Sequence, residues 1–305
     1  IRPAITNNMK KQTRLRIKTG VMNKKKRYLI TGGTGFLGAE LIKRLIAAGY
    51  SNLVVVSRNE GKLTELKHKF PSVEIIPGNI DDTFVCDKAC KDVAGIFHLA
   101  AFKHIGLAEQ NTKECVSSNV IGSLNLLEAT RKYLPDFILG ISTDKAARVN
   151  GVYGATKLLQ ERLFSEYERM NPKTKYRTVR YGNVLYSTGS VLCKWRDNLR
   201  NNKQVIITDP DATRFYWPVE QAVDLIFDCL NKSTNSTPHF FPMKSMRLGD
   251  LLDAMCKKYL PRSAKPNVKI IGLQPGENMH EVITAGGKDS SQTEKFTPKE
   301  IMALI

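Results

Sequence analysis

The sequence lacks a long run of apolar residues. Its uninterrupted apolar stretches are short, as in Leu53 to Val56, whereas a transmembrane helix needs roughly 20 such residues. With 305 residues, of which 42% are hydrophobic, the chain is long enough for one large α/β domain with a smaller companion. We therefore expect a globular, cytoplasmic protein that does not span a membrane.

Cysteine pairs with the spacing of a metal site are also missing. Cys86 and Cys90 lie close together, but no second pair and no histidine accompanies them at ligand spacing. The six cysteines are expected to be buried or reduced thiols, and no metal site is predicted.

Acidic residues are absent from the first 27 positions, which contain ten basic residues. The formal net charge of the whole chain is +18, so the rest of the chain has a net charge of +8. We expect residues 1–22 to be a basic, disordered tail without a specific role, and Met22 is a candidate initiator. A phosphate-binding arm and an organelle transit peptide are the alternatives, and no specific nucleic-acid partner is expected.

A strand, a glycine turn and a helix open the rest of the chain. The short run Arg27 to Thr31 is followed by TGGTGFLG, in which Gly32, Gly35 and Gly38 have the spacing GxxGxxG. Such glycines let the backbone approach a pyrophosphate while the helix N-terminus faces its charge. The segment predicts dinucleotide binding.

The end of the second predicted strand indicates which dinucleotide binds. Leu53 to Val56 is followed by Ser57, Arg58 and Asn59, where an NAD-selective domain places an acid for the ribose 2′-hydroxyl. The guanidinium of Arg58 suits a 2′-phosphate and favours NADP, whereas Glu60 is the nearby acid that would favour NAD.

Further segments predict an α/β fold, a Rossmann-like doubly wound parallel sheet over residues 23–184. The remaining predicted strands are Val73 to Ile76, Gly95 to Leu99, Phe137 to Ile141 and Tyr176 to Arg180, and long helices are predicted over Thr112 to Tyr133 and Tyr153 to Glu168. Residues 185–305 are expected to form mainly a smaller substrate-binding lobe, with returning Rossmann elements at about 218–238. That lobe includes helices from Pro218 to Leu230 and from Leu248 to Tyr259.

The stretch STDKAARVNGVYGATK, residues 142–157, carries groups suited to proton transfer. Asp144 and Lys145 stand side by side, and Tyr153 and Lys157 share one helix face at i and i+4. An ammonium near a phenol favours the phenolate, which makes the phenol a base near neutral pH. The alternative is that Tyr153 and Lys157 only form an exposed helix face.

These motifs resemble those of a known family. The matching segments span about residues 27–300 and are TGGTGFLG, HLAAFKHI (98–105), STDKAA (142–147), YGATK (153–157), RYGNV (180–184), TRF (213–215) and PGENMHE (275–281). The chain resembles the extended short-chain dehydrogenases/reductases, specifically the soluble UDP-N-acetylglucosamine 4,6-dehydratases that also invert carbon 5. Those enzymes serve bacterial pseudaminic acid and capsule sugar pathways.

The resemblance implies three sets of residues around NADP and a UDP-hexose. The catalytic set is Thr143, Asp144, Lys145, Tyr153 and Lys157. The NADP set is Gly32, Thr34, Gly35, Phe36, Leu37, Gly38, Ser57, Arg58, Asn79, Ile80, Ala100, Ala101, Asn119, Ser142, Tyr153, Lys157 and Tyr181. The substrate set is Lys103, Asn183, Arg214 and Glu277, with Arg214 as the partner of the UDP diphosphate.

The resemblance also implies a mechanism and an assembly. Tyr153 takes the proton of the sugar 4-hydroxyl, Asp144 protonates the departing 6-hydroxyl, and Lys145 removes the proton of carbon 5. A lysine base must be neutral, so the pKa of Lys145 is expected to be lowered by burial and by Lys157. Relatives pair through the two long helices, which predicts a homo-oligomer, at least a dimer.

Some positions separate this chain from its relatives. Asp144 and Lys145 match the acetamido-sugar group, and Tyr153 matches its inverting branch. The family usually has Asn-Pro at Arg148 and Val149, a small residue at Tyr186, Arg at Thr188 and Asp at Asn79. The alternatives are a UDP-sugar 4-epimerase, which needs only the Tyr-Lys pair, and a non-catalytic NADP-binding regulator with an altered loop over residues 148–152.

Overall fold

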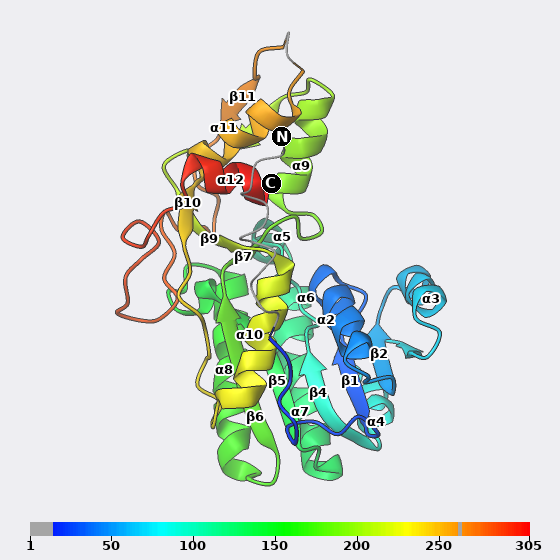
Figure 1. Cartoon of the computed structure of the whole chain (residues 1–305). Helices are drawn as coiled ribbons and strands as arrows, with labels where there is room; N and C mark the ends of the chain where they lie inside the picture. The colour runs from blue at the N-terminus through cyan, green and yellow to red at the C-terminus, as the bar shows by residue number, and fades with distance from the viewer. Residues whose placement is uncertain (1–14, 262–263) are drawn as a thin grey trace.

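A six-stranded parallel sheet lies at the centre of the computed structural model, which describes residues 15–261 and 264–305 (Figure 1). Its strands, in spatial order, are β3 (Glu74–Pro77), β2 (Leu53–Ser57), β1 (Arg27–Thr31), β4 (Val93–His98), β5 (Phe137–Thr143) and β6 (Lys175–Tyr181). The strand order reverses between β1 and β4, as in doubly wound dinucleotide-binding folds. The predicted fold class is confirmed.

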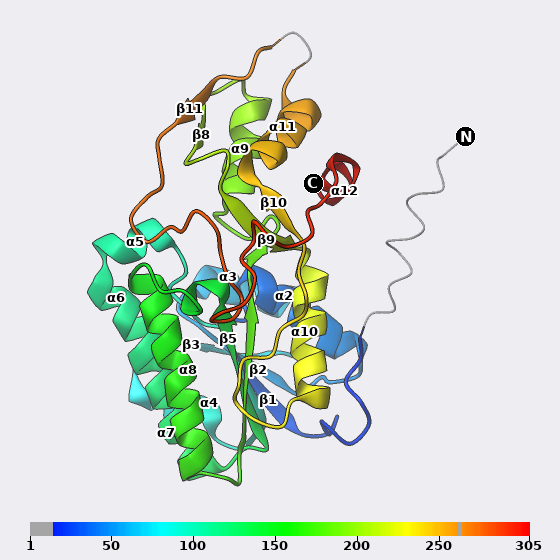
Figure 2. The ribbon, with the colours of Figure 1, turned by 90° about the vertical axis from the view of Figure 1, so that its left-hand side faces the viewer.

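Helices cover both faces of this sheet, which explains why its strands are apolar along their length (Figure 2). One face carries α2 (Phe36–Ala47), α3 (Glu60–Lys69) and α10 (Val219–Lys232). The other carries α4 (Thr83–Cys90), α7 (Gly122–Tyr133) and α8 (Val152–Met170). Helix α10 packs on α2, so the chain returns to the sheet after it has entered the second lobe.

The C-terminal lobe has a hydrophobic core of its own and sits above the carboxyl ends of the strands (Figure 1). Its elements are β7 (Asn183–Val184), α9 (Val191–Arg200), β8 (Val205–Ile207), β9 (Thr213–Trp217), β10 (Ser245–Arg247), α11 (Leu248–Tyr259), β11 (Val268–Ile270) and α12 (Pro298–Leu304). Strands β10, β9 and β7 form one small sheet, and β11 and β8 form another. Trp195 is fully buried in this core.

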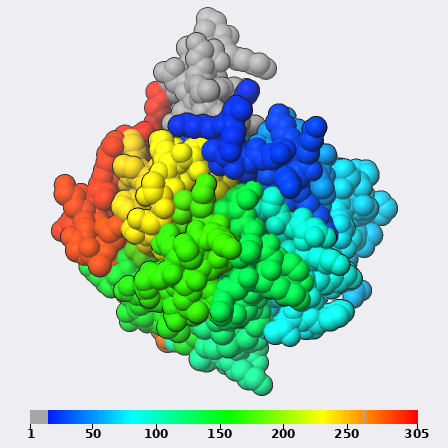
Figure 3. Space-filling model, turned by 90° about the horizontal axis from the view of Figure 1, so that it is seen from below, coloured from blue at the N-terminus to red at the C-terminus, as the bar shows by residue number. Residues whose placement is uncertain are grey.

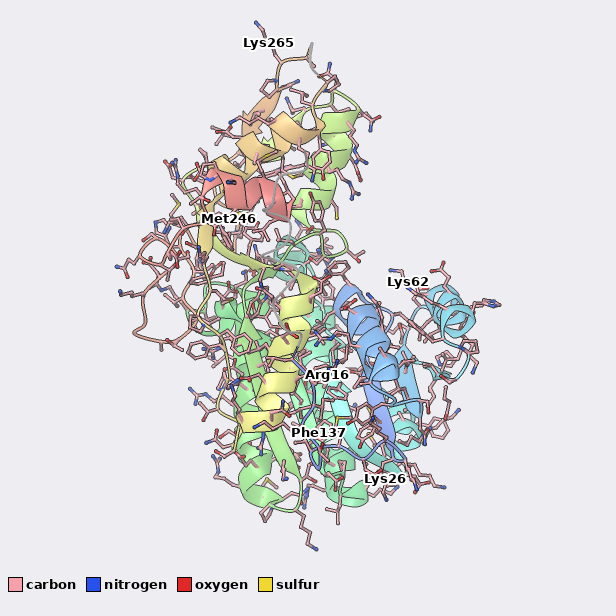
Figure 4. All side chains as sticks on the ribbon, viewed as in Figure 1. Arg16, Lys26, Lys62, Phe137, Met246 and Lys265 are labelled. Carbon is pink, nitrogen blue, oxygen red and sulfur yellow. The ribbon has the colours of Figure 1, made fainter. Side chains whose placement is uncertain are left out.

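The segment from residue 15 to residue 22 is not a free tail, contrary to the prediction. Figure 3 shows the start of the described chain beside α10, and Figure 4 shows Arg16 close to that helix. The Leu15 backbone N–H donates to Asp224 at 3.1 Å, and Asn231 donates to the Arg16 carbonyl at 2.9 Å. Met22 is buried in the core of the parallel domain, and Ile17 and Val21 pack against the same core. The remainder of the predicted tail lies outside the described residues.

The long helix predicted from Thr112 to Tyr133 is interrupted. It consists of α6 (Thr112–Val116), a π-helical turn over Ser117–Ile121, and α7. A short helix, α5 (Ile105–Gln110), precedes it. π-Helical turns are rare and often occur at functional sites, and this one holds Asn119.

Candidate active site

A cavity of about 930 Å³ runs along the carboxyl edge of the parallel sheet and into the C-terminal lobe. It is lined by every predicted site residue except Asp144 and Asn119, which lie behind its wall. Its charged lining has one carboxylate, Glu277, and seven cationic side chains: Arg58, Lys62, Lys103, Lys145, Lys157, Lys194 and Arg214. Such a cavity suits ligands that carry several negative charges.

The glycine turn after β1 packs so closely against neighbouring backbone that residues with a side chain would not fit at two of its positions. Gly32 has a φ of +66°, and a Cβ atom there would lie 2.7 Å from the Ala100 nitrogen. A Cβ atom at Gly38 would lie 2.6 Å from the Gly33 Cα atom. Because the turn opens the N-terminus of α2 to the cavity, the residues present fit the pyrophosphate of a nicotinamide dinucleotide.

The end of β2 lines the side of the cavity at which the sequence predicts that the adenosine binds. The Ser57 and Thr34 hydroxyl groups are 2.8 Å apart and join the second strand to the glycine turn. Asn59 accepts a hydrogen bond from the Lys62 N–H at 2.9 Å and caps α3, which leaves Arg58 exposed at the cavity. Lys62 extends from α3 beside this region in Figure 4.

Asn119 supports the cavity wall and does not line the cavity. Its amide accepts from the Phe102 N–H at 2.7 Å and donates to the Phe102 carbonyl at 2.9 Å. It also donates to the Thr156 hydroxyl on α8 at 3.0 Å. The side chain is fully used by these contacts, so its role here is to hold the segment after β4 against the helix of Tyr153.

Tyr153 and Lys157 both face the cavity from α8, but they do not act on each other as predicted. Burial raises the pKa of Tyr153 to about 12, and the nearby Lys145 ammonium only partly offsets that effect. Burial lowers the pKa of Lys157 to about 8, and its ammonium donates to Gln160. Desolvation outweighs the neighbouring cations, so the predicted phenolate is not favoured in this structure.

Asp144 and Lys145 form a buried ion pair with a third member, Glu281, which ends the motif PGENMHE but was not among the predicted site residues. The Lys145 ammonium is 3.0 Å from Asp144 Oδ1 and 3.3 Å from Glu281 Oε1. Burial acts to lower the pKa of Lys145, but the two carboxylates outweigh it and raise that pKa above its ordinary value. The predicted lowering of the Lys145 pKa is therefore wrong.

The surroundings shift the pKa values of the two carboxyl groups, Asp144 and Glu281, in opposite directions. Burial, aided by Glu281, raises the pKa of Asp144 even though Lys145 opposes the change. The pKa of Glu281 is lowered, because Lys145 and Arg214 outweigh the opposing effect of burial. Asp144 is thus the carboxyl that retains a proton more readily.

A second buried network fixes the strand end that carries Ser142. The Ser142 hydroxyl donates to Glu161 Oε1 at 2.5 Å, and Arg180 binds both oxygens of that carboxylate. Arg180 also donates to the Ile283 carbonyl of the C-terminal lobe at 2.8 Å. Glu161 was not among the predicted site residues, and its position on the buried face of α8 was the available signal.

The predicted substrate residues meet at the lobe side of the cavity. Arg214 on β9 is buried and donates to the carbonyls of Thr213 and Met279 at 2.9 and 3.1 Å. Lys103 donates to a backbone carbonyl across the cavity mouth at 2.8 Å, and burial lowers its pKa. Asn183 and Glu277 complete this group of lining residues.

Two of the departures from the family pattern, Tyr186 and Thr188, lie in the loop before α9. Tyr186 has a φ of +55°, a conformation that costs a side-chain-bearing residue about 1–2 kcal/mol. Its hydroxyl is 2.9 Å from that of Tyr259, and the Arg196 guanidinium lies over its ring. The carbonyl of Thr188 is the acceptor for Lys103. Packing within the lobe therefore stabilises an unusual loop at the cavity.

A family model described as polysaccharide biosynthesis protein matches residues 28–303, which is most of the chain. The chain belongs to this polysaccharide biosynthesis family. The resemblance to extended short-chain dehydrogenases/reductases of the UDP-N-acetylglucosamine 4,6-dehydratase type is confirmed.

Proteins similar in sequence to this chain are described as having different functions. An inverting UDP-N-acetylglucosamine 4,6-dehydratase of Campylobacter jejuni is 32% identical, with 90% of this chain and 82% of that protein covered. A UDP-glucose 4-epimerase of Rickettsia bellii is 29% identical over 85% of this chain and 78% of that protein. An uncharacterized membrane protein of Methanocaldococcus jannaschii is 36% identical, with coverage of 85% and 80%. Within residues 15–261 and 264–305, by contrast, no helix is long and apolar enough to cross a bilayer.

Solved structures share the fold of this family member. Pen from Bacillus thuringiensis aligns with a TM-score of 0.85 at 25% identity, covering 92% of this chain and 97% of that one. A dTDP-glucose 4,6-dehydratase from Streptomyces venezuelae, with NAD bound, aligns with a TM-score of 0.77 at 17% identity, covering 91% and 95%. The second likeness concerns the fold alone.

The contacts of Asn119 yield a stability prediction. The variant Asn119→Ala should lose about 3 kcal/mol of unfolding free energy, because the Phe102 backbone groups and the Thr156 hydroxyl lose a buried partner. Chemical denaturation measures this loss. The control Asn111→Ala removes one exposed hydrogen bond and should cost about 1 kcal/mol or less. Equal losses of unfolding free energy in the two variants would show that the buried hydrogen bonds of Asn119 stabilise the fold no more than one exposed hydrogen bond does.

Proposed function

We propose that this protein is an NADP-dependent UDP-N-acetylglucosamine 4,6-dehydratase that inverts carbon 5 and makes a UDP-4-keto-6-deoxy amino sugar for glycan biosynthesis. The observation that carries the proposal is the buried Asp144–Lys145 pair beside Tyr153 on a strongly basic cavity. Dehydration needs an acid for the leaving hydroxyl and a base for carbon 5, in addition to the tyrosine. The inverting dehydratase among the relatives supports the same assignment.

The first half of the reaction uses Tyr153 to take the proton of the sugar 4-hydroxyl. A phenol with a pKa of about 12 becomes an effective base only when positive charge is brought close to it. Lys157, one helical turn away on α8, is placed to contribute such charge. The nicotinamide dinucleotide supplies the hydride acceptor for carbon 4 and the hydride donor for carbon 6.

The second half uses the pair at the end of β5. The new ketone at carbon 4 acidifies carbon 5. Lys145 passes the proton of its ammonium to Asp144, whose Oδ1 atom is 3.0 Å away, and as a neutral amine it then takes the proton of carbon 5. Asp144, whose pKa is raised by burial, donates a proton to the departing 6-hydroxyl, and water leaves. Carbon 5 then receives a proton on its opposite face, which inverts its configuration.

Turnover in deuterated water tests this sequence of steps. With UDP-N-acetylglucosamine and NADP⁺ we expect a 4-keto-6-deoxy product that carries deuterium at an inverted carbon 5, identified by NMR. Lys145→Ala and Tyr153→Phe should each reduce the rate by about 100-fold or more, and Lys145→Ala should leave NADP binding intact. The absence of any such product at high enzyme concentration would refute the dehydratase.

Other outcomes of that experiment distinguish the alternatives. A UDP-sugar 4-epimerase, supported by the Rickettsia relative, would release an epimer without loss of water. A non-catalytic NADP-binding regulator would bind the dinucleotide, and Tyr153→Phe would change nothing measurable. Retained configuration at carbon 5 with full activity in Lys145→Ala would remove Lys145 from the mechanism.

NADP as the cofactor is a proposal that rests on Arg58, which is exposed at the cavity after β2. Arg58→Ala should weaken NADP binding about tenfold or more and leave NAD binding nearly unchanged, because only NADP offers a 2′-phosphate for a charge-assisted bond. Calorimetric titration with both dinucleotides measures the difference. Lys69→Ala, at the far end of α3, is the control, and equal losses for NADP and NAD in Arg58→Ala would refute the assignment.

A cytoplasmic homodimer formed through α7 and α8 is also proposed. Large apolar side chains are exposed on α8 and on the π-helical turn that leads into α7, including Leu159, which is 50% exposed, and Ile121. Light scattering at micromolar concentration should give at least twice the chain mass of 34.2 kDa. Leu159→Lys should shift the mass toward that of one chain, whereas Met302→Lys, on α12 of the lobe, should not. A monomeric native protein would contradict the proposal.

A further inference from the structure

Glu281 reaches the catalytic pair from a different part of the chain. Its Oε1 atom lies 3.3 Å from the Lys145 ammonium, and Asp144 Oδ1 lies 3.0 Å from the same nitrogen. Lys145 follows β5 of the parallel sheet, whereas Glu281 belongs to the C-terminal segment after β11. Glu281 is fully buried and does not line the cavity, so it contacts the pair without reaching the substrate.

The position of Glu281 is fixed on several sides. Its backbone N–H donates to the Ser290 hydroxyl at 2.9 Å, and its carbonyl accepts from the Ser290 N–H at 2.7 Å. The Ser290 hydroxyl is in turn 2.6 Å from that of Thr213 on β9. The Asn278 amide donates to Glu281 Oε2 at 3.1 Å. These contacts hold the carboxylate still and leave its Oε1 atom for Lys145.

Neither carboxylate is fully satisfied by hydrogen bonds. Asp144 Oδ2 and Glu281 Oε1 are buried oxygens without a hydrogen-bond partner among the described residues. A buried carboxylate that is not fully hydrogen-bonded destabilises a fold unless charge compensates for it. Here the compensation comes from one shared ammonium and from Arg214, which also acts electrostatically on Lys145 and Glu281.

We propose that Glu281 is a positioning residue that clamps the Lys145 ammonium against Asp144 and thereby sets how protons are distributed over the catalytic pair. This inference rests on the proposed dehydratase function. It makes the acid and base of the parallel domain dependent on a carboxylate supplied by the C-terminal lobe. Two anions that fix the position of the Lys145 side chain preorganise this base before the substrate binds.

The charges facing the cluster give the direction of the effect. Asp144 and Glu281 face Lys145 from two sides, Arg214 approaches from β9, and the Tyr153 phenol approaches from α8. Glu281 contributes to the raised pKa of Lys145 and to the raised pKa of Asp144. Neutralising Glu281 should therefore lower both pKa values together, and the pH–rate profile should move to lower pH.

The test compares the wild type with Glu281→Gln, Glu281→Asp and the control Glu294→Gln, which removes an exposed lobe carboxylate paired with Lys244. In Glu281→Gln, we expect the pH–rate profile for kcat to shift by about one unit to lower pH, a tenfold change in the neutral fraction of a lysine. KM should change less than about threefold, because Glu281 does not touch the cavity. Glu281→Asp should restore most of the wild-type profile. A loss of kcat with an unshifted profile in both variants would overturn the proposal.

A second measurement does not require turnover and separates this inference from the proposed function. Competitive acylation of Lys145 followed by mass spectrometry reports its neutral fraction as the pH is varied. Its labelling at one pH should rise about tenfold in Glu281→Gln and stay unchanged in Glu294→Gln. If Glu281→Gln does not fold, the pKa of Lys145 measured by the same labelling in the wild type tests the proposal. A Lys145 that titrates at or below the ordinary lysine value of about 10.4 overturns the clamp.

If the protein makes no dehydration product but shows the tenfold labelling change, the role of Glu281 is supported and the proposed reaction is refuted. A protein that dehydrates the sugar and shows neither the labelling change nor the profile shift would retain the reaction and lose the clamp.

Discussion

The parallel alignment of six strands is the constraint on which the site depends. Because all six strands run in one direction, the segments that follow them emerge at one edge of the sheet. That edge collects the glycine turn after β1, Arg58 after β2, Asn79 after β3, Ala100 after β4, Lys145 after β5 and Tyr181 at the end of β6. The reversal of strand order between β1 and β4 separates the covering loops and opens the cavity between them.

The electrostatics of the cavity have two layers. Cationic side chains line the surface that a ligand would contact, and two buried carboxylates, Asp144 and Glu281, lie behind one of them, Lys145. The two buried carboxylate networks, one around Lys145 and one around Arg180, fix side-chain geometry more than they add stability, because desolvation offsets much of the attraction. The outer layer attracts anionic ligands, and the inner layer orients the groups that act on them.

The C-terminal lobe is part of the site and not only its cover. Arg180 on β6 binds the Ile283 carbonyl, Asn150 binds the Glu277 carbonyl, and Glu281 pairs with Lys145. Each contact joins a residue of the parallel domain to the same stretch of the lobe. A shift of that stretch would therefore alter the Asp144–Lys145 pair and the lobe side of the cavity at the same time.

The sequence by itself determined the fold class, the positions of the six strands of the parallel sheet, and a set of site residues of which all but Asp144 and Asn119 line the cavity. The elements could be predicted because apolar periodicity and the glycine turn are local signals, and because strand ends in such a fold meet at one edge. Most of the individual site residues were implied by the resemblance of short motifs to those of the family. Helix α11 has the predicted bounds, and α8 begins one residue before the predicted start. The tertiary structure alone decided the charge states of Tyr153 and Lys145, the role of Asn119 in the cavity wall and the place of Glu281. These properties depend on burial and on partners distant in the chain, since Glu281 follows Lys145 by more than a hundred residues and acts on it across 3.3 Å.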